Sequence, residues 1–253
     1  MAILVFDSGI GGLGVVAALN RLAPGLPLTY LADNGFFPYG EKPDELLLRH
    51  ITEVIGAAIA RERPEAVVIA CNTASTIALT ALRATFALPF IGCVPPIKPA
   101  AASSASRTIG VLATKATVRR PYLNGLIERF APDCQVLSLG TPALAELAEQ
   151  KFRGADVDVS AAVAPLFRQE GGRRIDSIAL GCTHYTFLLP EFLTLRPDIS
   201  WHDPALPVAR QTLKIIAPLH LTPAERAARF TGAPVAAELL APFALEPRLN
   251  HPA

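Results

Sequence analysis

Six short apolar runs, separated by longer segments with helical spacing, constrain the fold of this chain most. Helical patterns fill 43–61, 73–86, 115–130 and 141–152. Strands and helices that alternate at these lengths are typical of βαβ units, in which helices cover both faces of a parallel sheet. We therefore predict a doubly wound α/β fold. The strand-like runs are Ile3–Phe6, Leu28–Ala32, Ala66–Ala70, Thr108–Ala113, Gln135–Leu139 and Ile175–Leu180.

The two halves of the chain resemble each other. Residues 107–118 repeat the strand, turn and helix pattern of 2–12. We expect two similar doubly wound parallel-sheet lobes that face each other across a central cleft. Pro-rich stretches at 93–99 and 201–207 are the expected crossings between lobes. The first lobe is then 1–97 with 207–253 and the second is 98–206, and the last six residues are expected to form a loose tail.

Composition limits the class of partner. Hydrophobic residues make up 51% of the 253 residues and charged residues 18%, as in ordinary soluble globular proteins. The net charge of +1 favours neither nucleic acid nor an anionic membrane, so we expect a small-molecule substrate. No apolar stretch approaches the roughly 18 residues of a membrane span, and the first residues lack the basic region of a signal peptide. The expected location is the cytoplasm.

Two cysteines stand in matching positions. Cys71 and Cys182 each end a continuous apolar run and precede small hydroxyl or amide residues and a helical pattern. Open α/β sheets bind ligands at the carboxyl ends of their strands, and a helix N-terminus there would lower the pKa of a thiol. Two thiols on opposite faces of one substrate could remove a proton from one side and return it on the other. Cys93 and Cys134 lack this context, so we expect them to be structural, and all four to be free thiols.

A glycine-rich segment at 7–14 follows the first strand. It contains GlyXGlyXXGly, and Asp33 ends the next strand, as in a dinucleotide-binding fingerprint. Asp7 at the start of the turn would repel a pyrophosphate, so we favour a different use. The glycines would hold Asp7 and Ser8 at a cleft, where Asp7 could bind a substrate ammonium or assist a thiol. The plainer alternative is that Asp7 caps the following helix.

Other polar residues lie beside the two cysteines. His184 follows Cys182 by two residues and is suited to acid/base work, although a hydrogen-bonded core histidine is an alternative. Asn72, Thr73 and Thr183 offer short donors for a carboxylate, or caps for the next helices. The loop at 33–40 is expected to form a rim over a pocket.

These motifs together resemble the glutamate racemases, a cofactor-independent group within the aspartate/glutamate racemase superfamily. The resemblance covers nearly the whole chain, and the order of the motifs makes it specific. It rests on residues 6–13, 32–33, 38–40, 70–75, 110–114 and 181–185.

The resemblance implies a mechanism. Two cysteines exchange the α-proton of glutamate without pyridoxal phosphate, metal or any other cofactor, and supply D-glutamate for peptidoglycan synthesis. Cys71 would deprotonate the D enantiomer and Cys182 the L enantiomer. Asp7 and His184 match the residues that assist them, and a further catalytic acid falls at Glu149. Members of the group commonly form homodimers. Positions that match the lining of the substrate site are Asp7, Ser8, Pro38, Tyr39, Gly40, Asn72, Thr73, Thr114, Thr183 and His184.

The chain departs from the family pattern at several places. Thr141 stands where a cysteine is common, Glu146 where an apolar residue or proline is common, and 95–99 replaces a more usual Glu-Pro crossing. The departures at Thr141 and Glu146 make the assignment of Glu149 less secure. The departure at 95–99 is expected to affect hinge motion or dimer contacts rather than the chemistry. The long N-terminal extension of some members does not precede Met1, so we expect no regulation by a cell-wall precursor bound through it.

Three alternative functions stay open at this point. A related racemase that acts on aspartate would use the same two thiols with a pocket of different length. A non-catalytic protein that binds an acidic amino acid would keep its affinity without the cysteines. A dinucleotide-dependent oxidoreductase would require a nicotinamide cofactor at the glycine-rich loop.

Overall fold

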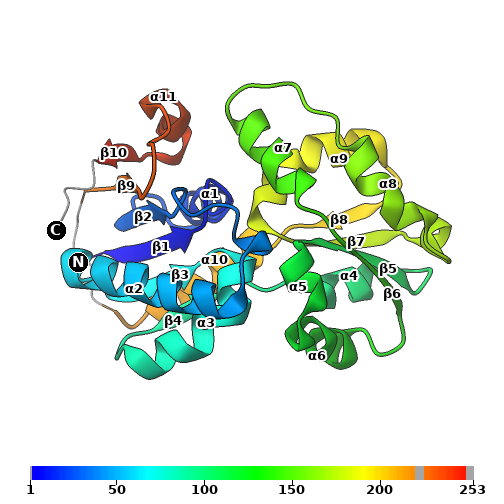
Figure 1. The fold of residues 1–253 in the computed structure, drawn as a ribbon, viewed down its shortest axis with the longest axis horizontal. Coiled ribbons are helices and arrows are strands. Elements are labelled where there is room, and N and C mark those ends of the chain that lie inside the picture. The colour runs from blue at the N-terminus through cyan, green and yellow to red at the C-terminus, as the bar shows by residue number, and fades with distance from the viewer. Residues whose placement is uncertain (1, 220–224, 249–253) are drawn as a thin grey trace. The chain divides into compact units, whose positions relative to one another are not determined.

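The chain divides into two compact α/β units in a computed structural model that describes residues 2–219 and 225–248. Unit 1 consists of 1–93 with 205–253, and unit 2 consists of 94–204. Each unit contains one sheet, and all strand pairs in both sheets are parallel. The predicted α/β class with parallel sheets is confirmed (Figure 1).

The sheet of unit 1 has the strand order β10-β9-β2-β1-β3-β4. Its centre is built from the apolar runs that the sequence shows, and every residue of β1, β2 and β3 is buried. Such two-sided burial explains why these strands are continuous apolar runs. The strands are β1 (Ile3–Asp7), β2 (Leu28–Ala32), β3 (Ala66–Ile69), β4 (Phe90–Gly92), β9 (Ala227–Phe230) and β10 (Glu246–Arg248).

Helices of unit 1 cover both faces of this sheet. Leu4 and Phe6 of β1 pack in one core with buried residues of α2 and α3, which lie against each other. Helix α1 packs against α10, so the segment after the second crossing belongs to this unit (Figure 1). The helices are α1 (Leu13–Leu22), α2 (Asp44–Glu62), α3 (Asn72–Thr85), α10 (Ala205–Ile216) and α11 (Ala237–Leu240), with short 3₁₀ turns η1 (Tyr39–Glu41) and η4 (Ala241–Phe243).

The sheet of unit 2 has the strand order β6-β5-β7-β8. Helices α4 and α6 share a core with β5 and β7, while α7, α8 and α9 lie on the other side of the strands in Figure 1. The strands are β5 (Thr108–Ala113), β6 (Gln135–Gly140), β7 (Ser177–Gly181) and β8 (Ser200–His202). The helices are α4 (Ile97–Ser103), α5 (Lys115–Arg119), α6 (Pro121–Phe130), α7 (Ala143–Phe152), α8 (Ser160–Arg168) and α9 (Leu189–Leu195), with 3₁₀ turns η2 (Gly172–Arg174) and η3 (Thr183–Leu188).

Two expectations need correction. The helix expected over 115–130 is two helices, because Arg120 has an extended backbone (ψ 141°) in front of Pro121. Proline lacks an N–H and disfavours the α conformation in the residue before it. The expected loose tail starts too early, because Arg248 belongs to β10. Residues 249–253 of that tail lie outside the described residues.

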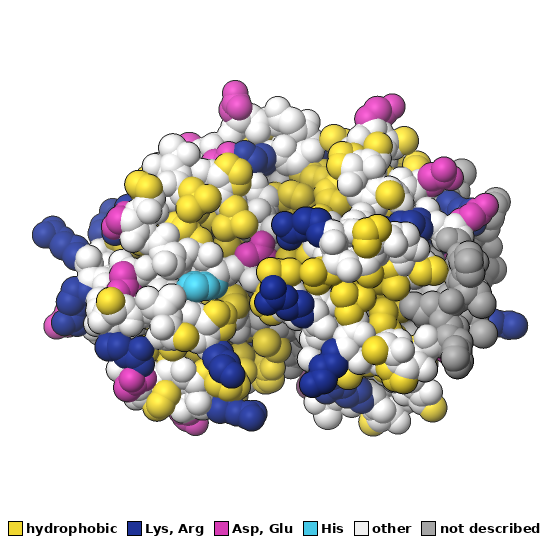
Figure 2. Space-filling model, turned by 180° about the vertical axis from the view of Figure 1, so that it is seen from behind, with side chains coloured by type: hydrophobic (Ala, Val, Ile, Leu, Met, Phe, Trp, Pro, Cys, Tyr) yellow, Lys and Arg dark blue, Asp and Glu magenta, His cyan; other side chains and the backbone are white. Residues whose placement is uncertain are grey.

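The surface agrees with the nearly neutral composition. Basic and acidic side chains are interspersed over the face seen in Figure 2 rather than gathered into one patch of either sign. Within the described residues, no helix is long and apolar enough to cross a membrane.

Candidate active site

The loop after β1 and the start of α3 meet at the carboxyl edge of the unit 1 sheet. β1 and β3 are neighbours, and the N–H of Ala70 donates to the carbonyl of Phe6 at 2.8 Å. The chain therefore leaves the two strands side by side, at Asp7 and at Cys71. Asp7 is fully buried, and only 5% of Cys71 is exposed.

Cys71 is the N-cap residue of α3. Its Sγ accepts a hydrogen bond from the N–H of Ala74 at 3.5 Å, and Ser8 Oγ lies 3.5 Å from the same sulfur. Helix N-termini favour negative charge, because their first N–H groups point outwards along the axis. The position of Cys71 is thus suited to a thiolate, as the sequence predicts.

Asp7 does not cap the following helix. Its Oδ1 accepts a hydrogen bond from the N–H of Gly9 at 2.9 Å, while the N-cap of α1 is Gly12, which makes no side-chain cap bond. The capping alternative for Asp7 is therefore wrong. The carboxylate instead stabilises the turn that also carries Ser8.

Asn72 and Thr73 lie in the first turn of α3, and both are 2% exposed. Because Cys71 is the cap, the capping alternative does not hold for either of them. The side-chain amide of Asn72 has neither a donor nor an acceptor partner among the described residues. A buried amide without partners costs free energy, so this group is suited to a bound polar ligand.

The loop between β2 and α2 places Tyr39 and Gly40 in η1, with Pro38 as its N-cap. The phenolic OH of Tyr39 donates to Oδ2 of Asp33. Burial raises the pKa of Tyr39, and the negative charge of Asp33 raises it further. The hydroxyl is thus a neutral donor committed to Asp33, and the loop can offer a substrate only its other groups.

Asp33 collects further donors from two other elements. Nε2 of His50, on α2, lies 2.6 Å from Oδ2, and Thr231, just after β9, donates to Oδ1 at 2.6 Å. The His50 ring also stacks on Phe36 at 4.0 Å. Sequence reasoning missed His50 and Thr231, because nothing in their local patterns distinguishes them.

Cys182 directly follows β7, one of the two central strands of unit 2, and is 7% exposed. The expected α-helix does not begin there. A 3₁₀ turn, η3, follows Cys182, and α9 begins only near Pro190. An α-helix that ran through Pro190 would lose a backbone bond and clash with the preceding turn. The side chain of Cys182 makes no cap bond, in contrast to that of Cys71.

Cys182 is followed by a chain of contacts through a histidine to a carboxylate. Nδ1 of His184 lies 3.9 Å from Sγ of Cys182, and Nε2 of His184 lies 3.2 Å from Oε1 of Glu149, which α7 carries. Arg153 donates to the other oxygen of Glu149 at 3.3 Å. A carboxylate that holds one ring nitrogen fixes the orientation of the imidazole and stabilises its protonated form. The sequence-predicted Cys182, His184 and Glu149 therefore lie in one chain of contacts.

The other expected residues of unit 2 differ in their surroundings. Thr114 is the N-cap of α5, and its Oγ1 accepts from the N–H of Thr117 at 3.2 Å, as its plainer role would have it. Thr183 is 1% exposed beside Cys182. Tyr185, a residue without an assigned role in the sequence, donates to the carbonyls of Ala113 (3.2 Å) and Thr141 (3.1 Å). Burial and the nearby Cys182 raise its pKa, so it stays a donor.

The remaining cysteines have structural surroundings. Cys93 is completely buried, and its N–H donates to Ser75 Oγ at 2.9 Å. Cys134 is half-buried, and burial raises the pKa of its thiol. All four cysteines are free, and no group of His, Cys, Asp and Glu within the described residues could hold a metal ion.

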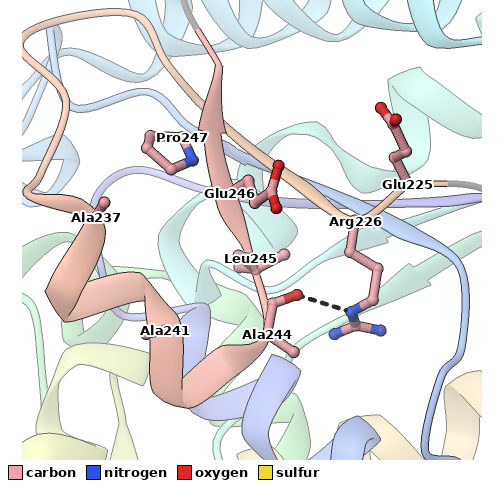
Figure 3. A pocket seen from close by; sticks show the side chains of 8 residues that line it. All are labelled: Glu225, Arg226, Ala237, Ala241, Ala244, Leu245, Glu246 and Pro247. Carbon is pink, nitrogen blue, oxygen red and sulfur yellow. Dashed lines mark hydrogen bonds between the residues drawn. The ribbon is translucent and has the colours of Figure 1, made fainter.

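One cavity of unit 1 is lined by neither Cys71 nor Cys182. It has a volume of about 650 Å³ and lies between the start of β9, β10 and α11 in unit 1 (Figure 3). Its cation, Arg226, donates to the carbonyls of Ala244 (3.0 Å), Leu26 and Phe243 (3.2 Å) and to Oδ1 of Asn20 (2.6 Å). The guanidinium thus joins the C-terminal segment to the end of α1, and we assign this cavity no catalytic role.

Comparison with known proteins decides the family. A model of the Asp/Glu/hydantoin racemases matches residues 11–199, a range that contains both Cys71 and Cys182. The chain belongs to this family. Members of the family named glutamate racemase are similar along most of the sequence. The relative from Granulibacter bethesdensis is 52% identical over 84% of this chain and 78% of its own, and that from Brucella anthropi is 45% identical over 85% and 80%.

Solved structures from the same family share the fold. The Escherichia coli glutamate racemase, crystallised with L-glutamate and the activator UDP-MurNAc-Ala, has a TM-score of 0.89 and 37% identity over 98% of this chain and 96% of its own. The Francisella tularensis glutamate racemase, crystallised with D-glutamate, has a TM-score of 0.77 and 25% identity over 98% and 95%.

Proposed function

We propose that this chain is a glutamate racemase that interconverts L- and D-glutamate by proton transfer between two thiols, without a cofactor. Two observations together carry the proposal. A buried cysteine lies at the end of a strand in each unit, and the chain is 52% identical to a protein named glutamate racemase. The named E. coli and F. tularensis relatives were crystallised with one enantiomer each. The reaction class is isomerisation of an amino acid.

In the proposed mechanism Cys71 takes the α-proton of D-glutamate. A thiolate is the form that can accept this proton, and the Ala74 N–H and the α3 N-terminus favour the thiolate. Asp7 and Ser8 stand beside it on the β1 loop. When the reaction runs from L to D, Cys71 starts as the thiol and donates a solvent-exchangeable proton to the α-carbon.

Cys182 performs the same step on L-glutamate. His184 lies next to its sulfur and is oriented by Glu149, so the imidazole can stabilise the thiolate or share its proton. Inversion requires that both thiols reach one α-carbon from opposite faces, and the proposal therefore includes closure of the two units on the substrate.

The proposal also explains the buried polar groups near the thiols. An amino-acid α-proton is very weakly acidic, so negative charge that develops on the substrate needs fixed donors and little water. The unpartnered Asn72 amide is one such donor, and we propose that Ser8, Thr73, Thr183 and the backbone at Pro38–Gly40 are others. Thr114 would act from the end of β5, with a hydroxyl shared with its capping role.

Exchange in deuterated water tests the reaction and its substrate together. We expect both enantiomers of glutamate to lose their α-proton signal and to become racemic, measured by NMR and chiral chromatography. Aspartate is expected to exchange far more slowly. Exchange with aspartate alone would show that aspartate, not glutamate, is the substrate. Tight binding of glutamate without exchange would indicate a non-catalytic binding protein.

Cofactor independence has its own test. Activity is expected to survive dialysis against EDTA and treatment with hydroxylamine, which captures pyridoxal phosphate. Loss of activity that zinc or pyridoxal phosphate restores would contradict the two-thiol mechanism.

The wider role follows from the reaction. We propose that the chain acts in the cytoplasm as a homodimer and supplies D-glutamate for peptidoglycan. Expression in a bacterium that requires D-glutamate is expected to restore growth without the supplement. Light scattering is expected to give twice the 26.8 kDa chain mass. A monomer with full activity would remove the homodimer from the proposal.

A further inference from the structure

The loop that carries Asp7 and Ser8 contains three glycines within four residues, Gly9, Gly11 and Gly12. Glycine has more backbone freedom than any other residue, so such a loop keeps one shape only if contacts from outside hold it. The direction of the Asp7 carboxylate and of the Ser8 hydroxyl depends on that shape. The contacts that hold the loop therefore affect the surroundings of the Cys71 thiol beside it.

Gly9 is held from two sides. Its N–H donates to Oδ1 of Asp7 at 2.9 Å, and its carbonyl accepts a hydrogen bond from the phenolic OH of Tyr30 at 2.5 Å. Tyr30 lies on β2, the strand next to β1, and its side chain is completely buried. The two bonds fix the peptide groups on both sides of the Gly9 Cα, since each peptide group is planar.

The Tyr30 ring also limits the loop by contact. A Cβ atom added to Gly12 would lie 3.0 Å from Cε2 of Tyr30 and 2.8 Å from Cβ of Asp7. The loop thus packs directly on the ring, and the close approach is possible because residue 12 has no side chain.

We propose that Tyr30 is a positioning residue for the Cys71 thiol. Its hydroxyl orients Gly9, Gly9 orients the Asp7 carboxylate, and the same turn places Ser8 Oγ 3.5 Å from Sγ of Cys71. Tyr30 acts through the loop and takes no part in proton transfer. The inference rests on the function proposed above in one respect, namely that Cys71 is a base.

Tyr30→Phe is the test variant, because it removes the hydroxyl and keeps the ring against Gly12. Tyr185→Phe is the matched control for Cys71. It removes an equally buried phenol that donates to two backbone carbonyls, but in unit 2. Iodoacetamide alkylation of Cys71 and Cys182 is followed in the same sample by peptide mass spectrometry, so each thiol is measured beside the other.

In Tyr30→Phe we expect Cys71 to react about fivefold more slowly relative to Cys182, the effect of losing one hydrogen bond to a thiolate. The control is expected to leave the Cys71 rate unchanged. For racemisation by Tyr30→Phe, we expect kcat to fall about tenfold and KM to change less than about twofold, because misplacement of a reacting group acts mainly on the chemical step.

An unchanged ratio of Cys71 to Cys182 alkylation in Tyr30→Phe would overturn the inference. Equal slowing or acceleration of both thiols would also overturn it, because general destabilisation would then explain the effect. Alkylation requires no turnover, so it is independent of the proposed function. Racemisation that persists in Cys71→Ser would defeat the proposed function instead.

Discussion

At the scale of single residues, the two thiols differ in the neighbouring groups that could stabilise a thiolate. Cys71 is stabilised by a helix N-terminus and a serine, whereas Cys182 relies on a histidine that a carboxylate orients. The loss of kcat on removing one of these neighbouring groups should therefore depend on its place in the chain of contacts. His184 is nearer to the sulfur than Glu149 is.

His184→Asn is expected to lower kcat by about 10²-fold, in the range of an acid/base group. Glu149→Gln keeps the shape and one hydrogen-bonding oxygen and removes the charge, so we expect a loss of about tenfold. Circular dichroism of the glutamate solution gives both rates. A loss in Glu149→Gln as large as that in His184→Asn would show that the carboxylate acts on its own rather than through the imidazole.

Asp33 is a second residue whose importance depends on its partners. It is 1% exposed and accepts bonds from Tyr39, His50 and Thr231. Asp33→Ala leaves these three groups without their acceptor, and we expect the free energy of unfolding to fall by about 3 kcal/mol. Thr231→Val removes one donor and should cost about 1 kcal/mol. Urea unfolding measures both, and equal losses would mean that Asp33 does not join the three elements.

At the scale of elements, glycines in the two units offer a contrast. Gly12, at the start of α1, has no room for a side chain, because a Cβ would lie 2.8 Å from Cβ of Asp7 and 3.1 Å from Cβ of Ala70. Gly125, within α6, has nothing within 4 Å of such an atom. The first glycine is required by packing and the second is not.

Gly12→Ala is therefore expected to lower both activity and stability, since the β1 loop must move away from β3. Gly125→Ala should raise the free energy of unfolding by about 0.5 to 1 kcal/mol, because alanine favours the helix. Thermal unfolding with racemase assays on both variants tests this difference. A stable, fully active Gly12→Ala variant would contradict the tight packing around Asp7.

The sequence predicts the buried strands of both units well, because two-sided burial leaves long apolar runs. It misses β4, β8, β9 and β10, because strands of only three or four residues are too short for an apolar run to stand out. It also joins α5 and α6 into one helix, although Pro121 already indicates the break. Around Cys182 it predicts an α-helix where the chain forms a 3₁₀ turn.

Side-chain partners distant in sequence could not be predicted. The motifs name Asp7, Ser8, Cys71 and His184, and in the structure Ser8 lies beside Cys71 and His184 beside Cys182. The bond from Tyr30 to Gly9 is hidden, because Tyr30 reads as one more residue of an apolar strand. Local sequence patterns indicate the secondary structure and burial of a residue, but its contacts with residues distant in sequence are visible only in the folded structure.

At the scale of the whole molecule, the chain forms unit 1, then unit 2, and then returns to unit 1. Cys71 lies at the carboxyl edge of the unit 1 sheet and Cys182 at that of the unit 2 sheet, so neither unit alone contains both of the proposed bases. We therefore expect the reaction to divide into two half-reactions, one for each cysteine. Each half-reaction should survive the loss of the other cysteine.

The most direct measurement is deuterium incorporation from deuterated water by Cys71→Ser and Cys182→Ser, with each enantiomer of glutamate. We predict that Cys182→Ser exchanges the α-proton of D-glutamate without inverting it, because Cys71 returns a deuteron to the same face. Cys71→Ser should do the same with L-glutamate, and neither variant should produce the opposite enantiomer at more than a trace rate. Racemisation at the wild-type rate in either variant would contradict the two-thiol mechanism.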